Sequence, residues 1–140
     1  MRYFIAFLAL AGFVVSTLAL RVHYNTGTEP CSINEHWDCG IVNHSSFSVI
    51  DHVPVAAIGM AGYLLLGVLA LARRRILLLI AAIVGLAFAL YLSNIEHSVL
   101  EVWCLYCVIS QGIIALIALA SILWLVTAQR AKSRALKAGA

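Results

Sequence analysis

Charged side chains are scarce in this chain. Lys, Arg, Asp and Glu make up 11% of its 140 residues and hydrophobic residues 64%, whereas soluble domains average about 25% charged residues. This composition excludes an ordinary soluble fold and predicts an integral membrane protein. The formal net charge is only +3, so we expect no nucleic-acid partner.

The apolar residues fall in four long runs, at 3–20, 53–72, 76–92 and 102–126. A helix of about 17–25 residues crosses the hydrocarbon core of a bilayer, so each run can span it. We therefore predict an all-α fold, an integral membrane four-helix bundle that uses residues 1–140 as a single domain. Its helices are expected at about 3–22, 54–72, 76–93 and 102–127.

The few charges are sorted by position along the chain. All six acidic residues lie after the first run or before the fourth: Glu29, Glu35, Asp38, Asp51, Glu96 and Glu101. Eight of the nine basic residues lie elsewhere, and Arg21 is the exception. The positive-inside rule then predicts that both termini are cytoplasmic and that the long loop between the first two helices faces outward. The frayed basic tail from Ala128 would stay inside.

That long loop carries turn residues at 25–30 and a less polar second half. We expect the first part to be irregular and the second to form a short interfacial helix over the mouth of the bundle. Pro54 suits the first turn of the next helix. The first run could instead be a cleaved signal peptide, although its apolar core exceeds the usual ~7–15 residues.

Four cysteines form two pairs, both predicted to lie on the outer side. Cys104 and Cys107 are three apart at a helix start, so their sulfurs share one face, and the free N–H groups and dipole there stabilise a thiolate. Cys31 and Cys39 lie in the polar loop. A periplasm or lumen allows disulfides to persist, so the two pairs predict thiol–disulfide exchange, with the loop pair shuttling between a soluble partner and Cys104.

Other interpretations of the cysteines remain open. The pairs could be structural disulfides that only staple loops of a tetraspan protein. Zinc is a further possibility for a Cys-x-x-Cys motif, with His36 and His44 as added ligands, but no second such motif exists and we expect no metal. A transport subunit would need polar residues at mid-membrane in several helices, which the sequence lacks.

Three polar residues are candidates for substrate binding. Gln111 lies one helical turn beyond Cys107 on the same face, where its amide could bind a substrate carbonyl or make an interhelical hydrogen bond. Asn43 and Ser45 are similar candidates from the outer loop.

The order of these motifs resembles the vitamin K epoxide reductase family, and especially its bacterial homologues. The matching stretches are residues 39–45, 53–59 with Gly62-Tyr63, and 91–107. They include a loop cysteine pair, Ser45 six residues past Cys39, and Cys-x-x-Cys opening the fourth helix. The DsbB family does similar chemistry, but there the Cys-x-x-Cys motif lies in the first outer loop.

The resemblance implies a four-helix bundle around a quinone (ubiquinone, menaquinone or vitamin K). It implies that Cys107 attacks the quinone, Cys104 exchanges with Cys39, and Cys31 meets the external dithiol. Ser45 matches a serine near the quinone pocket. The vertebrate enzymes carry a tyrosine where this chain has Gln111 and an asparagine where it has Val55, which favours quinone over epoxide reduction.

The sequence thus predicts a thiol-dependent quinone reductase that supports disulfide formation. Its electrons would come from a separate thioredoxin-like or DsbA-like protein of the periplasm or lumen, because many bacterial relatives carry such a domain fused and this chain stops after the bundle. The expected location is a bacterial inner membrane. Reduction of vitamin K epoxide and a purely structural role are the alternatives.

Overall fold

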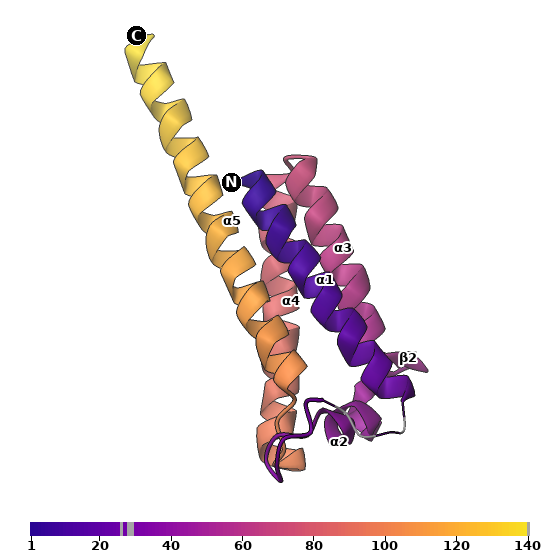
Figure 1. The fold of residues 1–140 in the computed structure, drawn as a ribbon. Helices are drawn as coiled ribbons and strands as arrows, with labels where there is room; N and C mark the ends of the chain where they lie inside the picture. The colour runs from indigo at the N-terminus through magenta and orange to yellow at the C-terminus, as the bar shows by residue number, and fades with distance from the viewer. Residues whose placement is uncertain (26, 28–29, 140) are drawn as a thin grey trace.

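A computed structural model describes residues 1–25, 27 and 30–139 of the chain. Four long helices run side by side along one axis (Figure 1). They are α1 (Arg2–Tyr24), α3 (Val55–Leu71), α4 (Arg75–Ile95) and α5 (Leu105–Ala138). The start of α1, the turn between α3 and α4 and the far part of α5 lie at one end, and the short elements of the loop lie at the other.

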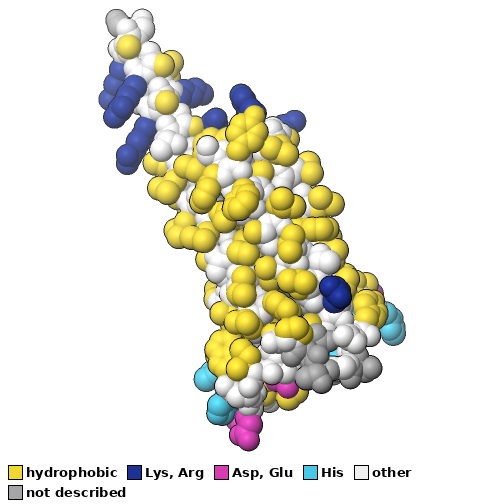
Figure 2. Space-filling view, viewed as in Figure 1, with side chains coloured by type: hydrophobic (Ala, Val, Ile, Leu, Met, Phe, Trp, Pro, Cys, Tyr) yellow, Lys and Arg dark blue, Asp and Glu magenta, His cyan; other side chains and the backbone are white. Residues whose placement is uncertain are grey.

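The lateral surface of the bundle is apolar. Hydrophobic side chains cover it in Figure 2, whereas Lys and Arg gather at the end with the termini and acidic residues and His at the opposite end. Among the described residues, α1, the continuous segment Arg75–Leu100 and α5 are long and apolar enough to cross a membrane. The 17 residues of α3 are at the short limit for a span. The chain is therefore an integral membrane protein.

Small residues let the helices approach closely in the core. A Cβ on Gly12 of α1 would lie 2.2 Å from the ring of Tyr63, so the Tyr63 ring occupies the space that this glycine leaves. Gly67 of α3 faces Ala9 of α1 in the same way, at an ordinary contact distance of 3.6 Å. Membrane helix pairs commonly pack through such residues because apolar burial alone does not drive helix association in lipid.

The loop between α1 and α3 is more finely divided than the single interfacial helix that we predicted. It contains the short helix α2 (Cys39–His44), a 3-10 turn η1 (Ser46–Ser48) and a hairpin of β1 (Val49–Ile50) with β2 (Val53–Pro54). Asp51 and His52 form the hairpin turn with positive φ. Pro54 precedes the first turn of α3, as expected. Residues 26, 28 and 29 of the predicted irregular part lie outside the described residues.

The connection from α4 to α5 begins with a π-helical turn, η2 (Glu96–Leu100), and turns at Glu101 with a left-handed φ of 54°. Helix α5 then starts at Leu105, three residues later than predicted. The reason is that Trp103 pairs with the outer loop: its N–H donates to the His36 carbonyl (2.8 Å) and its carbonyl accepts from Asp38 N–H (3.1 Å).

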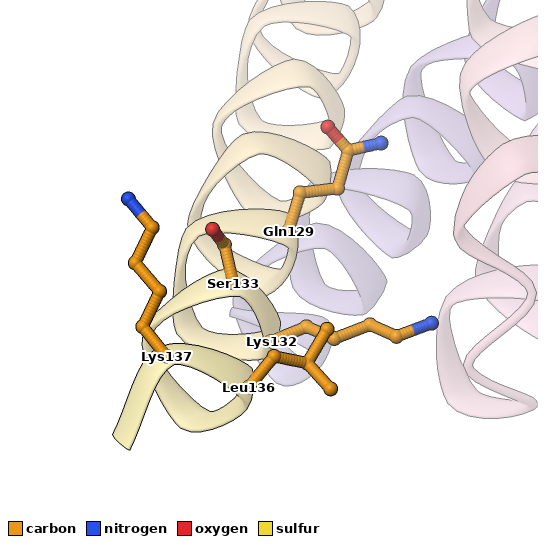
Figure 3. A pocket seen from close by; sticks show the side chains of 5 residues that line it. All are labelled: Gln129, Lys132, Ser133, Leu136 and Lys137. Carbon is orange, nitrogen blue, oxygen red and sulfur yellow. The ribbon is translucent and has the colours of Figure 1, made fainter. Parts of the chain in front are cut away.

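Helix α5 is also longer than predicted. Its 34 residues span about 51 Å, and its end projects past the bundle (Figure 1). The basic tail, expected to be frayed, is helical to Ala138 because Ala, Leu, Lys, Arg and Gln are good helix formers. Gln129, Lys132, Ser133, Leu136 and Lys137 line a surface depression there (Figure 3), at the end of the molecule opposite α2.

Candidate functional site

The loop cysteines form a disulfide. Cys31 and Cys39 are joined with their Cα atoms 5.8 Å apart. Asp38 caps α2: its Oδ1 accepts from the N–H groups of Gly40 (2.8 Å) and Ile41 (3.2 Å). This cap places Cys39 as the first residue of α2, at the mouth of the bundle.

Both loop cysteines are buried, at 2% exposure for Cys31 and 0% for Cys39. They pack in one buried cluster with Cys104, surrounded by the apolar side chains of Val22, Val42 and Val102. The pairing of Trp103 with the loop holds the start of α5 against the disulfide. We call Cys31, Cys39 and Cys104 the sulfur cluster. Its three members are the residues between which the sequence predicted exchange.

Asn43 ties the disulfide to the Cys-x-x-Cys motif. Its side-chain amide donates to the Cys39 carbonyl (2.9 Å) and to Cys104 Sγ (3.6 Å). The backbone carbonyl of Asn43 accepts a hydrogen bond from the Nδ1–H group of His23 in α1 (2.6 Å). Asn43 is 6% exposed. The geometry therefore makes it a bridge between Cys39 and Cys104, a contact that the sequence did not reveal.

Cys104 and Cys107 are free thiols. Cys104 is the N-cap of α5, and its sulfur accepts the backbone N–H of Cys107 (3.4 Å). The hydrogen bond from the Cys107 side chain lowers the pKa of the Cys104 thiol; the backbone N–H of Cys107 and the Asn43 amide act in the same direction, and burial opposes them. Cys104 is therefore prepared to carry negative charge as a nucleophile or leaving group.

A cavity of about 570 Å³ lies among the four long helices, beside Cys107. Its volume is within the ~300–1,000 Å³ of typical small-molecule sites. Most of its lining is apolar, from α1, α3, α4 and α5. The polar or ionisable residues on its wall are Ser16, Asn43, Ser45, Ser48, Tyr63, Ser93, Glu96, Tyr106, Cys107 and Ser110.

Two of the three predicted substrate-binding residues line this cavity. They are Asn43 and Ser45, and the Ser45 hydroxyl donates to the Val42 carbonyl (2.7 Å). Gln111 is not on the wall. Its amide oxygen accepts a hydrogen bond from the Ser93 hydroxyl, so it joins α5 to α4. This is the interhelical alternative that the sequence left open, and a role of Gln111 in substrate binding stays a prediction.

Two residues of the site escaped the sequence reasoning. Glu96 is 3% exposed, accepts the Cys104 N–H (3.1 Å) and lies on the cavity wall with Cys107. Tyr63 places its hydroxyl against the Ser110 carbonyl (2.7 Å) and hydroxyl (2.8 Å), one turn beyond Cys107. The sequence counted Glu96 only as an outer charge. Its position next to the end of an apolar run, eight residues before Cys104, was the available signal.

Within the described residues, no group of three or more His, Cys, Asp or Glu side chains is arranged to hold a metal ion. The polar groups of the site instead converge on sulfur atoms and on an apolar cavity. Such an arrangement can carry out thiol–disulfide exchange on one side and redox chemistry on an apolar ligand on the other.

The model of the vitamin K epoxide reductase family matches residues 3–127. The match spans the four cysteines, Glu96 and every element that builds the cavity. A comparison with curated proteins found no match.

Proposed function

Because the chain belongs to the vitamin K epoxide reductase family, whose members are membrane oxidoreductases of thiols and quinones, we propose that it is a thiol:quinone oxidoreductase that supports disulfide formation. A reduced thioredoxin-like or DsbA-like protein delivers two electrons to Cys31–Cys39. These pass to Cys104–Cys107 and then to a quinone in the cavity.

The observation that carries this proposal is the position of Cys104 and Cys107 between two environments. Cys104 packs in the sulfur cluster, whereas Cys107, three residues later, lines the cavity. A disulfide between these two cysteines would therefore connect the thiol side of the molecule to the quinone side.

Once the partner has reduced the loop disulfide, electrons and protons balance in the internal exchange without any other reagent. The partner first reduces Cys31–Cys39 to two thiols. The Cys39 thiolate then attacks Cys104 of an oxidised Cys104–Cys107 pair and releases Cys107. Cys31 attacks Cys39 of the mixed disulfide and releases Cys104 as a thiolate, a step that the lowered pKa of Cys104 favours because a less basic thiolate leaves faster.

The state described by the structure, with Cys31–Cys39 oxidised and Cys104 and Cys107 free, corresponds to the end of that exchange. The quinone step then follows. Cys107 sulfur adds to the quinone, Cys104 attacks Cys107 sulfur, and the hydroquinone leaves with both electrons. The two thiol protons end on the two quinone oxygens, and Cys104–Cys107 is again a disulfide.

The cavity supports a quinone as the oxidant. Its apolar wall fits a ring with a lipid-soluble chain, and Asn43 and Ser45 bring polar groups to the same wall as Cys107. Ubiquinone, menaquinone and vitamin K all have this chemistry. The volume and lining of the cavity are compatible with each of these three quinones.

The topology belongs to the same proposal. We place the termini and the turn between α3 and α4 in the cytoplasm and the cysteines on the periplasmic face of a bacterial inner membrane. The gathering of Lys and Arg at one end of the bundle and of acidic residues and His at the other supports this orientation (Figure 2).

The test is turnover of the purified protein in detergent with dithiothreitol and a short-chain quinone, followed by quinone absorbance. Wild type should form one hydroquinone per dithiol consumed. A protein whose disulfides are only structural would show no turnover. The same assay with vitamin K epoxide measures whether an epoxide is accepted.

A second reductant separates the two cysteine pairs. With a reduced thioredoxin-like protein in place of dithiothreitol, Cys31→Ala and Cys39→Ala should lose turnover, because a protein cannot reach Cys104 directly. Both variants should keep part of the dithiothreitol-driven activity, since a small dithiol can enter through the cavity. Equal losses with both reductants would contradict the shuttle.

A further inference from the structure

Glu96 is a buried acid that the proposed reaction does not yet use. It is 3% exposed at the outer end of α4, and no Lys or Arg is among the described residues that line the cavity beside it. A buried carboxylate without a cation is costly, so such a group is retained where it has partners or chemistry of its own. Glu96 also opens the π-helical turn η2, and single π turns often occur at functional sites.

The surroundings of Glu96 are the two reacting cysteines and the cavity. One carboxyl oxygen, Oε2, accepts the backbone N–H of Cys104 (3.1 Å). Glu96 and Cys107 lie on the wall of the same cavity. A single carboxyl group therefore joins the Cys-x-x-Cys motif to the space that the quinone would occupy.

The other ionisable groups nearby are less suited to receive the Cys107 proton. Tyr63 on α3 is hydrogen-bonded to Ser110. Cys104 interacts with the Cys107 side chain but is not on the cavity wall, so it is not placed to pass a proton to the quinone. Tyr106 is on the cavity wall, but its side chain carries a phenol and not a carboxylate. On its own element, His97 is exposed.

His23 of α1 and His44 of α2 are also excluded by position. His23 and His44 stack on each other with ring centroids 6.2 Å apart, and neither is on the cavity wall. Among the described residues that line the cavity, Glu96 is thus the only carboxylate.

We propose that Glu96 is the general base and acid of the quinone step, an inference that rests on the proposed function. As the Cys107 sulfur bonds to the quinone, its proton moves to the Glu96 carboxylate. Glu96 then gives this proton to a quinone oxygen, while Cys104 attacks Cys107 and its proton goes to the second oxygen. Two electrons and two protons leave with the hydroquinone, and Glu96 returns to its starting state.

The decisive variant is Glu96→Gln. Its amide oxygen can still accept the Cys104 N–H, so the position of η2 is kept and only the proton-carrying group is lost. General acid–base catalysis typically contributes about 10²–10⁴-fold, so we expect dithiothreitol-driven quinone turnover to fall by at least about 100-fold at pH 7. The loss should shrink as pH rises, because the Cys107 thiol then ionises without a base.

Glu101→Gln is the matched control. Glu101 is an exposed acid of the same connection, so its variant should keep wild-type turnover and pH profile. Glu96→Asp, which retains a carboxyl group one methylene shorter, should recover part of the activity. A Glu96→Gln protein with wild-type turnover and pH profile would overturn the proposal. So would a variant slowed equally at every pH, which would indicate a structural role.

Wild-type protein gives an independent readout if the variants do not fold. Time-resolved infrared spectra of reduced wild-type protein mixed with quinone should show a protonated carboxyl band that appears and decays within one turnover, and its absence would overturn the role of Glu96. The two proposals fail in different ways. If wild type does not reduce quinone, the proposed function fails; if wild type is active and Glu96→Gln is equally active, only the Glu96 proposal fails.

Discussion

Cys104 and Cys107 lie one helical turn apart but in different surroundings. Cys104 has no exposed surface and packs with the loop disulfide under Val22, Val42 and Val102. Cys107 is partly exposed and lines the cavity together with Glu96. One cysteine therefore faces a closed protein interior, and its neighbour faces a space open to a small apolar molecule.

This difference suggests how the Cys-x-x-Cys motif can separate thiol–disulfide exchange from quinone reduction. Thiol–disulfide exchange needs sulfur atoms close together, and Cys31, Cys39 and Cys104 pack in one buried cluster. The proposed quinone reduction needs an apolar cavity and a proton carrier, and the cavity and Glu96 lie on the Cys107 side. A three-residue spacing at a helix start directs the two sulfurs to these two places while keeping them close enough to form a disulfide.

The largest effects are expected from the cysteines themselves. Cys107→Ser should abolish quinone reduction with any reductant, because no sulfur then faces the cavity. Cys104→Ser should also stop turnover but still allow Cys107 to add to quinone, so an adduct should accumulate. Absorbance spectra and intact mass of each variant with quinone measure this. A quinone adduct in Cys107→Ser, or the same outcome in both variants, would contradict the separate roles of Cys104 and Cys107.

Replacing Asn43 should slow mainly the thiol–disulfide exchange in the sulfur cluster and not the quinone step. Asn43→Leu removes the amide that donates to Cys104 Sγ and the Cys39 carbonyl. Losing a hydrogen bond to a thiolate raises the pKa of Cys104, so internal exchange should slow by about 10-fold near neutral pH, roughly 1.4 kcal/mol. The loss should persist at higher pH, because Cys104 is the leaving group of the exchange and its basicity, not its ionisation beforehand, sets the rate.

Rapid quenching with an alkylating agent follows the exchange in that variant. Ile41→Ala, at an exposed position of the same helix, should behave as wild type. If Asn43→Leu instead changed the quinone KM and left exchange intact, Asn43 would act in the cavity, as the sequence had suggested.

Gly12→Ala should change packing at the cavity wall and leave the sulfur cluster unchanged. The added methyl group would overlap the Tyr63 ring, and overpacking of this kind costs about 1–3 kcal/mol of stability. Tyr63 is on the cavity wall, so the quinone KM should rise with little change in exchange rate. Gly112→Ala is the control, because its Cβ would meet open space. Thermal unfolding measures the stability of both variants, and steady-state kinetics measure their quinone KM.

The smallest effect is expected at Gln111. Gln111→Leu removes the interhelical hydrogen bond with Ser93 and should lower stability by about 0.5–1.5 kcal/mol. Quinone turnover should stay close to wild type. A several-fold fall in turnover with unchanged stability would instead assign the Gln111 amide to the substrate.

The helices and the cysteine motif were predictable because they depend on local patterns. Long apolar runs indicated the four helices, and the spacing of Cys104 and Cys107 placed both on one face. Gln111 illustrates the limit of such patterns: its helical register matched Cys107, but its partner, Ser93, is on another helix. The start of α5 was misplaced because the pairing of Trp103 with the outer loop is a tertiary contact.

The surroundings of the loop disulfide and of Glu96 were not predictable for the same reason. Cys31 and Cys39 lie in a polar stretch, and nothing in it indicates that both are buried against Cys104. Glu96 follows an apolar run like any residue at a membrane surface. Only the fold of η2 turns it inward to the cysteines.

The most direct test of transfer between the two sides is disulfide mapping in Cys31→Ala. Without Cys31, no other cysteine of the chain releases Cys39 once it has attacked Cys104, so the mixed disulfide should accumulate when quinone is added to the reduced protein after dithiothreitol has been removed. Mass spectrometry of peptides from the alkylated protein should find Cys39 joined to Cys104 and Cys107 alkylated. Finding only Cys104 joined to Cys107, with Cys39 alkylated, would contradict the relay.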